Sequence, residues 1–416
     1  MAQAASAVES PSTASTSAAV RSRGVDPWLL FAALALSCLG LVMVYSASAW
    51  LGREAAGAWE YHLVRHGARL GLGFLLLFAF SRVDYRLWRR FAPHLMALAV
   101  VALVAVLLIG REVNGARRWI SLGVINLQPS EFAKLALAIF LAAMLARQGE
   151  RVRSFRGGFL PVMISATVTM GLVLLERDLG TTILLGTLTL TVLFIAGTRS
   201  SYVLAAIMLA VPILWSQVMG VGYRRDRVES FLAGHNYQVE QSLIAIGSGG
   251  PWGLGLGHGR QKLGFLPEVH TDFILAAVGE ELGLLGIVAV VGLFSLLVWR
   301  GFLAALRAPD RFGVYLGCGI SALFALQALV NMAVVMQVIP AKGLTLPFLS
   351  YGGSSLLVSM ISVGILLSVS SCPRPWRLSD QRASERAASR DGRPSGRERS
   401  AAGHRANVRR PVPAAS

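Results

Sequence analysis

One carboxylate, Asp272, marks the place in this sequence where chemistry is most strongly indicated. It stands where a glycine-rich polar stretch that begins at Tyr237 runs into a long apolar segment, and Arg260, Lys262 and His270 precede it closely. An acidic group carried into a membrane helix costs free energy, so it is a candidate for function. The simpler alternative is a helix cap, because the helix dipole favours a carboxylate at the first turn.

Two further acids, Glu280 and Glu281, follow inside the apolar segment. A helix that starts at Asp272 would place Glu280 about 12 Å further along and on nearly the same face. Two adjacent glutamates cannot both face lipid, so one should pair with a basic group or line a polar cavity. We expect Glu280 to support Asp272 in catalysis, and a structural hydrogen-bonding role is equally open.

Two earlier segments supply more charge. Glu131 and Lys134 have the i,i+3 spacing that places both side chains on one helix face. They would form a structural ion pair, or Lys134 would contact an anionic ligand. Arg117 and Arg118 stand beside Trp119, which could be an interfacial anchor. The paired arginines could instead hold a phosphate through bidentate hydrogen bonds.

Hydroxyl groups complete the candidates. Ser350 and Ser354 lie in TLPFLSYGGSS, whose proline and paired glycines break a helix, and Asp178 is a candidate cap in the charged turn ERDLGTT. Irregular backbone at membrane depth is tolerated where it is buried or lines a cavity. Cations with one well-placed carboxylate suit an anionic, membrane-borne substrate. The cations would hold a phosphate leaving group, and the carboxylate would act as general base on a hydroxyl.

The composition indicates a polytopic membrane protein. The 416 residues are 54% hydrophobic and only 15% charged, with a mean hydropathy of +0.59. The net charge of +17 predicts no nucleic-acid partner, because the arginines cluster between and beyond the apolar segments. Three cysteines, far apart in sequence, show no metal-ligand spacing.

We predict an all-α polytopic fold, since a membrane-spanning segment must satisfy its own backbone hydrogen bonds. Ten apolar segments are long enough to cross a bilayer, at residues 28–48, 64–81, 91–110, 130–147, 158–176, 180–197, 200–219, 272–299, 312–338 and 352–371.

Arginine-rich connections alternate along the chain and predict that both termini are cytoplasmic. The large loop 220–271, between the seventh and eighth helices, would then be extracytoplasmic. We expect a ten-helix membrane domain over 27–372, flanked by a disordered cytoplasmic tail at 1–26 and a basic disordered cytoplasmic tail at 373–416.

Several motifs together resemble the SEDS family, the shape, elongation, division and sporulation proteins. They are RRWISLG with QPSEFAKLA, ERDLGTT, the run from YQVEQSLIAIGSGG to VHTDFILAAVGEELG, and KGLTLPFLSYGGSS, and they occur in order between about Arg111 and Ser355. GLGLGHGRQK with LPEVHTDF is more similar to the division members of the family than to the elongation members.

The resemblance implies a peptidoglycan glycosyltransferase of the bacterial inner membrane that polymerises lipid II at the division septum. It would work with a class B penicillin-binding protein transpeptidase and other divisome membrane proteins. The family's essential aspartate matches Asp272, its Glu–Lys pair Glu131 and Lys134, its loop tryptophan Trp119, and its helix glutamate Glu280.

As a hypothesis, Asp272 deprotonates the acceptor 4-hydroxyl or holds a divalent cation, Mg²⁺ or Mn²⁺, that does so. Arg117, Arg118, Lys134, Arg260, Lys262, His270, Ser350 and Ser354 are the candidate substrate-binding residues with Trp119. We expect no organic cofactor.

Two other functions remain open: a flippase or transporter for the lipid-linked precursor, and a non-catalytic division scaffold. A flippase needs a polar route through the midplane, and the third, fifth, sixth and seventh segments carry almost no charge.

Overall fold

The computed structural model describes residues 24–56, 61–113, 115–122, 125–234 and 236–371, and all of them belong to one compact unit. The predicted tail at 373–416 and residues 1–23 of the predicted N-terminal tail lie outside these residues.

The fold is a helical bundle with one small sheet. Its elements are α1 (Pro27–Ala56), α2 (Tyr61–Arg82), α3 (Arg86–Ile109), β1 (Arg111–Val113), β2 (Ala116–Leu122), β3 (Ile125–Leu127), α4 (Pro129–Gln148), η1 (Gly149–Arg153), η2 (Phe155–Phe159), α5 (Leu160–Leu175), α6 (Leu179–Ile195), α7 (Ser200–Met219), α8 (Gly222–Leu232), α9 (Tyr237–Gly249), α10 (Ile274–Leu306), α11 (Arg311–Val335) and α12 (Gly353–Ser371).

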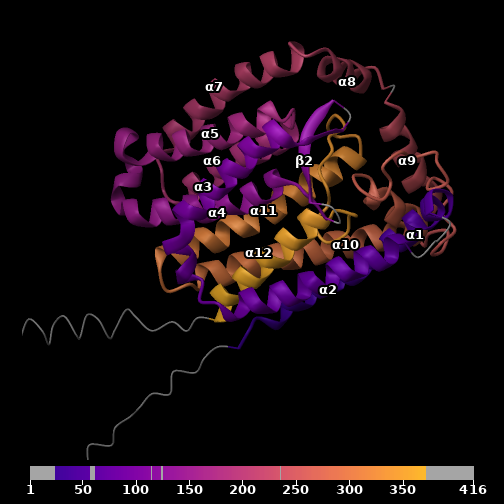
Figure 1. Cartoon of the computed structure of the whole chain (residues 1–416), viewed down its shortest axis with the longest axis horizontal. Helices are drawn as coiled ribbons and strands as arrows, with labels where there is room; N and C mark the ends of the chain where they lie inside the picture. Colours follow the sequence, from indigo (N-terminus) through magenta and orange to yellow (C-terminus); the bar gives the residue numbers. More distant parts are fainter. Residues whose placement is uncertain (1–23, 57–60, 114, 123–124, 235, 372–416) are drawn as a thin grey trace, which may run out of the picture. The chain divides into compact units, whose positions relative to one another are not determined.

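Each of the ten predicted spans corresponds to a helix. Among the described residues, nine helices are long and apolar enough to cross a membrane, and α6, with 17 residues, is a shorter apolar helix. In Figure 1, α4, α11 and α12 lie in the middle of the bundle, where most of their residues are buried. In contrast, α7 lies at the margin and has no buried residue.

A small sheet corrects the prediction that the chain is all-α. β1, β2 and β3 form an antiparallel sheet in the order β1-β2-β3 between α3 and α4. The connection was interpreted as a loop because its strands are short. The Asn114–Gly115 dipeptide, which favours tight hairpin turns, is the signal that could have revealed it.

The predicted loop 220–271 also contains regular structure. It holds α8 and α9, and α9 packs against α10 and α11. The Ser242 hydroxyl, on α9, donates a hydrogen bond to the Val335 carbonyl at the end of α11. These helices are too short and too polar to be recognised as membrane spans.

The start of α10 differs from the prediction as well. The helix begins at Ile274, two residues after Asp272, and its backbone breaks at Gly283, where φ is +67°. An added Cβ at Gly283 would lie 2.3 Å from the Gly253 nitrogen, so only glycine fits there. The expectation that Asp272 and Glu280 share one face of a continuous helix is therefore wrong, because Asp272 lies in the preceding turn.

Candidate active site

Asp272 lies at a meeting point of three segments. The Asn331 side-chain amide, from α11, donates hydrogen bonds to the main-chain oxygens of Asp272 (2.9 Å) and Leu344 (2.8 Å). The residue at the N-cap of α10 is Phe273, and no side chain caps that helix. Asp272 therefore does not cap α10, and the alternative interpretation of this residue as a helix cap is wrong.

The Asp272 carboxyl faces Gly343, where an added Cβ would lie 3.0 Å from Oδ2. Burial raises its pKa to about 7, and the negative charges of Glu268 and Asp178 raise it further than Arg118 and Arg227 lower it. Among the described residues this carboxyl has no hydrogen-bond or ion-pair partner. A carboxyl with a pKa near neutrality suits proton abstraction at physiological pH.

Lys342 belongs to the same charged cluster and was missed from the sequence. Burial lowers the pKa of its ammonium, and Asp178 opposes that effect. Its signal in the sequence is its place at the start of KGLTLPFLSYGGSS, the segment that also contains Ser350 and Ser354.

Asp178 caps α6 as predicted. Its carboxylate accepts hydrogen bonds from the Thr181 N–H (3.0 Å) and hydroxyl (2.9 Å). The neighbouring Glu176 is fully buried, and desolvation, followed by the charge of Asp178, raises its pKa to about 8. At pH 7 this carboxyl therefore favours its protonated form.

The hairpin arginines have different surroundings. The Arg118 guanidinium donates to the carbonyls of Glu176 (3.3 Å) and Arg177 (2.6 Å), while the Arg177 guanidinium donates to the Gly115 carbonyl (2.7 Å). Arg118 therefore fastens the sheet to the α5–α6 turn and brings positive charge to Asp272. Arg117 is exposed and pairs loosely with Glu112 at 3.5 Å. Trp119 is half-buried on β2.

The predicted ion pair at the start of α4 is present. The Lys134 ammonium donates to Glu131 Oε1 over 2.7 Å, and both residues are buried. Lys134 is only 1% exposed, so its ammonium is shielded from solvent and from any aqueous anion.

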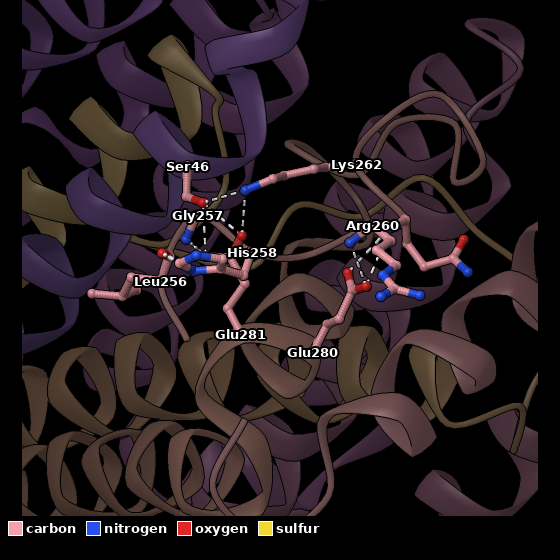
Figure 2. A network of polar contacts seen from close by, with 9 residues as sticks. Ser46, Leu256, Gly257, His258, Arg260, Lys262, Glu280 and Glu281 are labelled. Atoms are coloured by element: carbon pink, nitrogen blue, oxygen red, sulfur yellow. Dashed lines mark hydrogen bonds and ion pairs between the residues drawn. The ribbon is translucent and has the colours of Figure 1, made fainter. Parts of the chain in front are cut away.

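The two glutamates of α10 hold the glycine-rich loop, as Figure 2 shows. Glu280 Oε1 accepts hydrogen bonds from the main-chain N–H groups of Arg260 (2.6 Å) and Gln261 (3.2 Å). An added Cβ at Gly259 would lie 2.8 Å from the Glu280 carboxylate, so glycine allows this close approach. Of the two roles left open for Glu280, the structure shows hydrogen bonding.

Glu281 forms the second half of this loop anchor. Its carboxylate accepts from the Lys262 ammonium (2.6 Å), the Gly257 N–H (3.1 Å) and the Ser46 hydroxyl (2.6 Å), which links the loop to α1 (Figure 2). Lys262 is thus neutralised by a buried partner. Arg260 uses its main chain for the anchor, and its side chain is exposed.

The remaining candidates organise the backbone around Asp272. The Ser350 hydroxyl donates to the Thr271 carbonyl (2.5 Å), and the Tyr351 N–H donates to the His270 carbonyl (2.9 Å). The Ser354 hydroxyl donates to the Asn126 carbonyl (3.1 Å), which joins α12 to β3. Ser350 and His270 thus fix the turn that carries Asp272, and Ser354 fixes the sheet.

The donor set for a divalent cation is incomplete around Asp272. No group of three or more His, Cys, Asp or Glu side chains within the described ranges is arranged to hold a metal ion. These residues do not fit the predicted Mg²⁺ or Mn²⁺ site without additional ligands.

Comparison with known proteins places the chain in a family. A family model described as a cell cycle protein, and named for FtsW, RodA and SpoVE, matches residues 27–374. The chain belongs to this family. The resemblance inferred from its motifs is therefore confirmed.

The relatives agree with this assignment. The chain is 44% identical over 353 residues to the probable peptidoglycan glycosyltransferase FtsW of Trichlorobacter lovleyi, a match that covers 83% of this chain and 93% of that protein. It is 40% identical over 355 residues to stage V sporulation protein E of Bacillus subtilis, a match that covers 83% of this chain and 96% of that protein.

Solved structures are similar as well. One is a chain of a peptidoglycan synthase complex that coordinates polymerization and crosslinking, with a TM-score of 0.70, 30% identity, and coverage of 83% of this chain and 97% of that chain. The rod shape determining protein RodA of Thermus thermophilus has a TM-score of 0.63 and 31% identity, over 83% of this chain and 96% of that one.

Proposed function

We propose that this chain is a peptidoglycan glycosyltransferase that polymerises lipid II during cell division. The observation that carries this function is the Asp272 carboxyl, which has no hydrogen-bond partner among the described residues and a pKa of about 7. Both acidic groups (Glu268 and Asp178) and cationic groups (Arg118 and Arg227) influence this carboxyl. The chain is 44% identical to relatives named probable peptidoglycan glycosyltransferase FtsW.

The reaction is a displacement at a sugar carbon. The 4-hydroxyl of an acceptor GlcNAc attacks C1 of a lipid-linked donor, the new C1–O4 bond forms, and the bond from C1 to the pyrophosphate oxygen breaks. The ionised Asp272 carboxylate takes the hydroxyl proton. Arg118, Arg227 and Lys342 supply positive charge that stabilises the departing pyrophosphate.

A divalent cation is left out of this mechanism because the described side chains do not assemble a ligand set around Asp272. If a substrate pyrophosphate completed such a set, Mg²⁺ or Mn²⁺ would neutralise the leaving group. Adding either ion back after chelation measures that contribution separately from the role of Asp272.

The topology that suits this reaction has ten membrane crossings. We include α6 as the tenth, because it follows α5 directly and packs against α4, α5 and α11. Both termini would then be cytoplasmic, and Asp272, α8 and α9 would lie on the outer side, where lipid-linked sugars are polymerised.

We propose that the partner is a class B penicillin-binding protein, with other divisome membrane proteins at the septum. The similar chain from a synthase complex that couples polymerization with crosslinking supports a transpeptidase partner. The names FtsW and cell cycle protein among the relatives support the septal site in the inner membrane.

The test is lipid II polymerisation by the purified full chain with its transpeptidase partner. Asp272→Asn should lower the rate by about 10²–10⁴-fold, the range for loss of a general base. Asp226→Asn on α8 is the matched control, because it makes the same chemical change at an exposed carboxylate, and it should keep near-normal activity. Near-normal polymerisation by Asp272→Asn would remove Asp272 as the base. Inactivity of the wild-type protein in every condition would favour the scaffold or flippase.

A further inference from the structure

A pocket opens at the arginine-rich end of the bundle, between α3, α4 and the turns that follow α4. Its volume is about 230 Å³. Its walls include Pro93, Phe140 and Met144, and its polar groups come from Arg147, Gln148 and Arg151. No acidic side chain is among the described residues that line it. The pocket therefore combines an apolar wall with positive charge.

Local backbone geometry brings the polar groups together. α4 ends where Gly149 has a φ of +56°, and the chain turns through η1 and the π turn η2. Arg147 comes from the last turn of α4 and Arg151 from η1, so both reach the same opening. Small residues, Ala143 and Gly157, leave the space unfilled.

The polar groups of the pocket lack protein partners. Arg147 and Arg151 are exposed, and neither guanidinium has a hydrogen bond or ion pair among residues 24–371 that the structure describes. Gln148 Oε1 is buried and accepts no hydrogen bond. A buried acceptor without a donor is costly. A matching ligand would bring an anionic group for the arginines and a hydroxyl donor for Gln148.

The pocket is separate from the Asp272 site. Glu131 and Lys134 lie in the first turns of α4, whereas Arg147 lies in its last turn, roughly 20 Å further along the helix axis at about 1.5 Å per residue. An added Cβ at Gly149 would lie 3.3 Å from the Arg311 guanidinium, so basic connections that are distant in sequence meet here. The positive-inside rule assigns this end to the cytoplasmic leaflet.

We propose that this pocket binds the phosphoglycerol headgroup of an anionic phospholipid from the cytoplasmic leaflet. The phosphate would accept hydrogen bonds from Arg147 and Arg151, and a glycerol hydroxyl would donate to Gln148 Oε1. Ligand pockets commonly measure about 300–1,000 Å³. This pocket, at about 230 Å³, is smaller and therefore suits a headgroup better than a whole lipid. The acyl chains would lie outside, along α3, where Phe91 is 43% exposed. An ethanolamine headgroup would instead place its ammonium beside two guanidinium groups.

The experiment is native mass spectrometry of the full chain in detergent with equal amounts of phosphatidylglycerol and phosphatidylethanolamine. The wild-type protein should retain phosphatidylglycerol preferentially. Arg147→Gln with Arg151→Gln should reduce that occupancy about tenfold. The matched control, Arg153→Gln with Arg156→Gln, removes the same charge from exposed positions that do not line the pocket, and it should stay within about twofold of the wild type.

A second variant tests the shape of the pocket without changing its charge. Ala143→Leu fills the cavity while both arginines remain, and it should also lower phosphatidylglycerol occupancy in protein whose thermal transition shows that it is folded. Equal losses in the two double variants, or equal retention of both lipids by the wild type, would overturn the proposal in favour of diffuse surface charge. Displacement of the lipid by soluble sn-glycerol 3-phosphate at matched concentration would reassign the pocket to a soluble phosphate ester.

Discussion

Asp272 lies in the turn that precedes α10, Glu281 lies near the start of that helix, and the surroundings of these two acids differ in almost every respect. Glu281 accepts hydrogen bonds from Lys262, Gly257 and Ser46 and is 1% exposed. Asp272 has no such partner among the described residues, and burial raises its pKa to about 7. One acid is fully compensated by neighbouring groups. Within the described part of the chain, the Asp272 carboxyl is buried without a compensating partner, which costs free energy, and it gains or loses its proton near neutral pH.

The backbone, rather than the side chain, holds Asp272 in place. Asn331 binds its carbonyl, and Ser350 binds the carbonyl of Thr271. A carboxyl fixed through its main chain can remain unpaired, which is what a general base requires. The contrast fits a folding role for Glu281 and the role as general base that we propose for Asp272.

The largest effect on stability is expected for Glu281→Gln. This change leaves the Lys262 ammonium buried without a counter-charge, which costs about 3–5 kcal/mol. Thermal or denaturant unfolding in detergent measures it. Adding Lys262→Met to Glu281→Gln removes the stranded charge, and the glutamine oxygen can still accept from Gly257, so most of the loss should be recovered. If Glu281→Gln unfolded like the wild type, Glu281 would not be an anchor.

The next effect is expected for Gly343→Ala, which tests the space beside Asp272. The added methyl would lie 3.0 Å from Oδ2 and must displace the carboxyl. Because small misplacements of catalytic groups are costly, we expect polymerisation to fall by between about tenfold and a hundredfold with the fold intact. Gly180→Ala is the control, since its methyl would meet its nearest atom at an ordinary 3.5 Å. Equal rates for the two variants would show that the Asp272 carboxyl tolerates movement.

The sequence was a good guide to helices and a poor guide to connections. Apolar runs of bilayer length mark membrane helices directly, so predicted spans such as 200–219 coincide with α7 (Ser200–Met219). The strands at 111–127 and the helices α8 and α9 are short, and their stability depends on contacts with the bundle that periodicity does not record.

The residues of the candidate site also differ in how well the sequence predicted them. Its motifs identified Asp272 and the Glu131–Lys134 pair, because residue type and spacing carried the information. Pairing between distant segments could not be read from spacing: Lys262 was expected to bind substrate, and the structure pairs it with Glu281. Lys342 was missed because only the fold brings it into the charged cluster with Asp178.

A smaller effect is expected from pH. In the proposed mechanism Asp272 accepts a proton only when it is ionised, and with a pKa of about 7 its ionised fraction falls as pH falls. The polymerisation rate should therefore drop about tenfold between pH 8 and pH 6, one unit below the pKa. Stability has the opposite sign: a pKa above its unfolded value costs folding free energy as pH rises from about 4 to 7. Asp272→Asn should thus be at least as stable as the wild type at pH 8, and a clear loss of stability there would mean that the carboxylate has a structural partner.

The smallest effect is expected at the surface of α8, where Arg225 and Glu229 form an ion pair of 2.6 Å. Both side chains are more than half exposed, so water screens the pair, unlike the buried Lys262–Glu281 pair with the same separation of 2.6 Å. Glu229→Gln should leave the free energy of unfolding unchanged within the error of the measurement. Glu281→Gln makes the same change in an ion pair of equal length, so the difference between the two variants reports burial together with the additional hydrogen bonds that Glu281 accepts from Gly257 and Ser46. A loss at Glu229 as large as that at Glu281 would show that α8 is covered by a partner, since only desolvation gives an ion pair of this length such an effect.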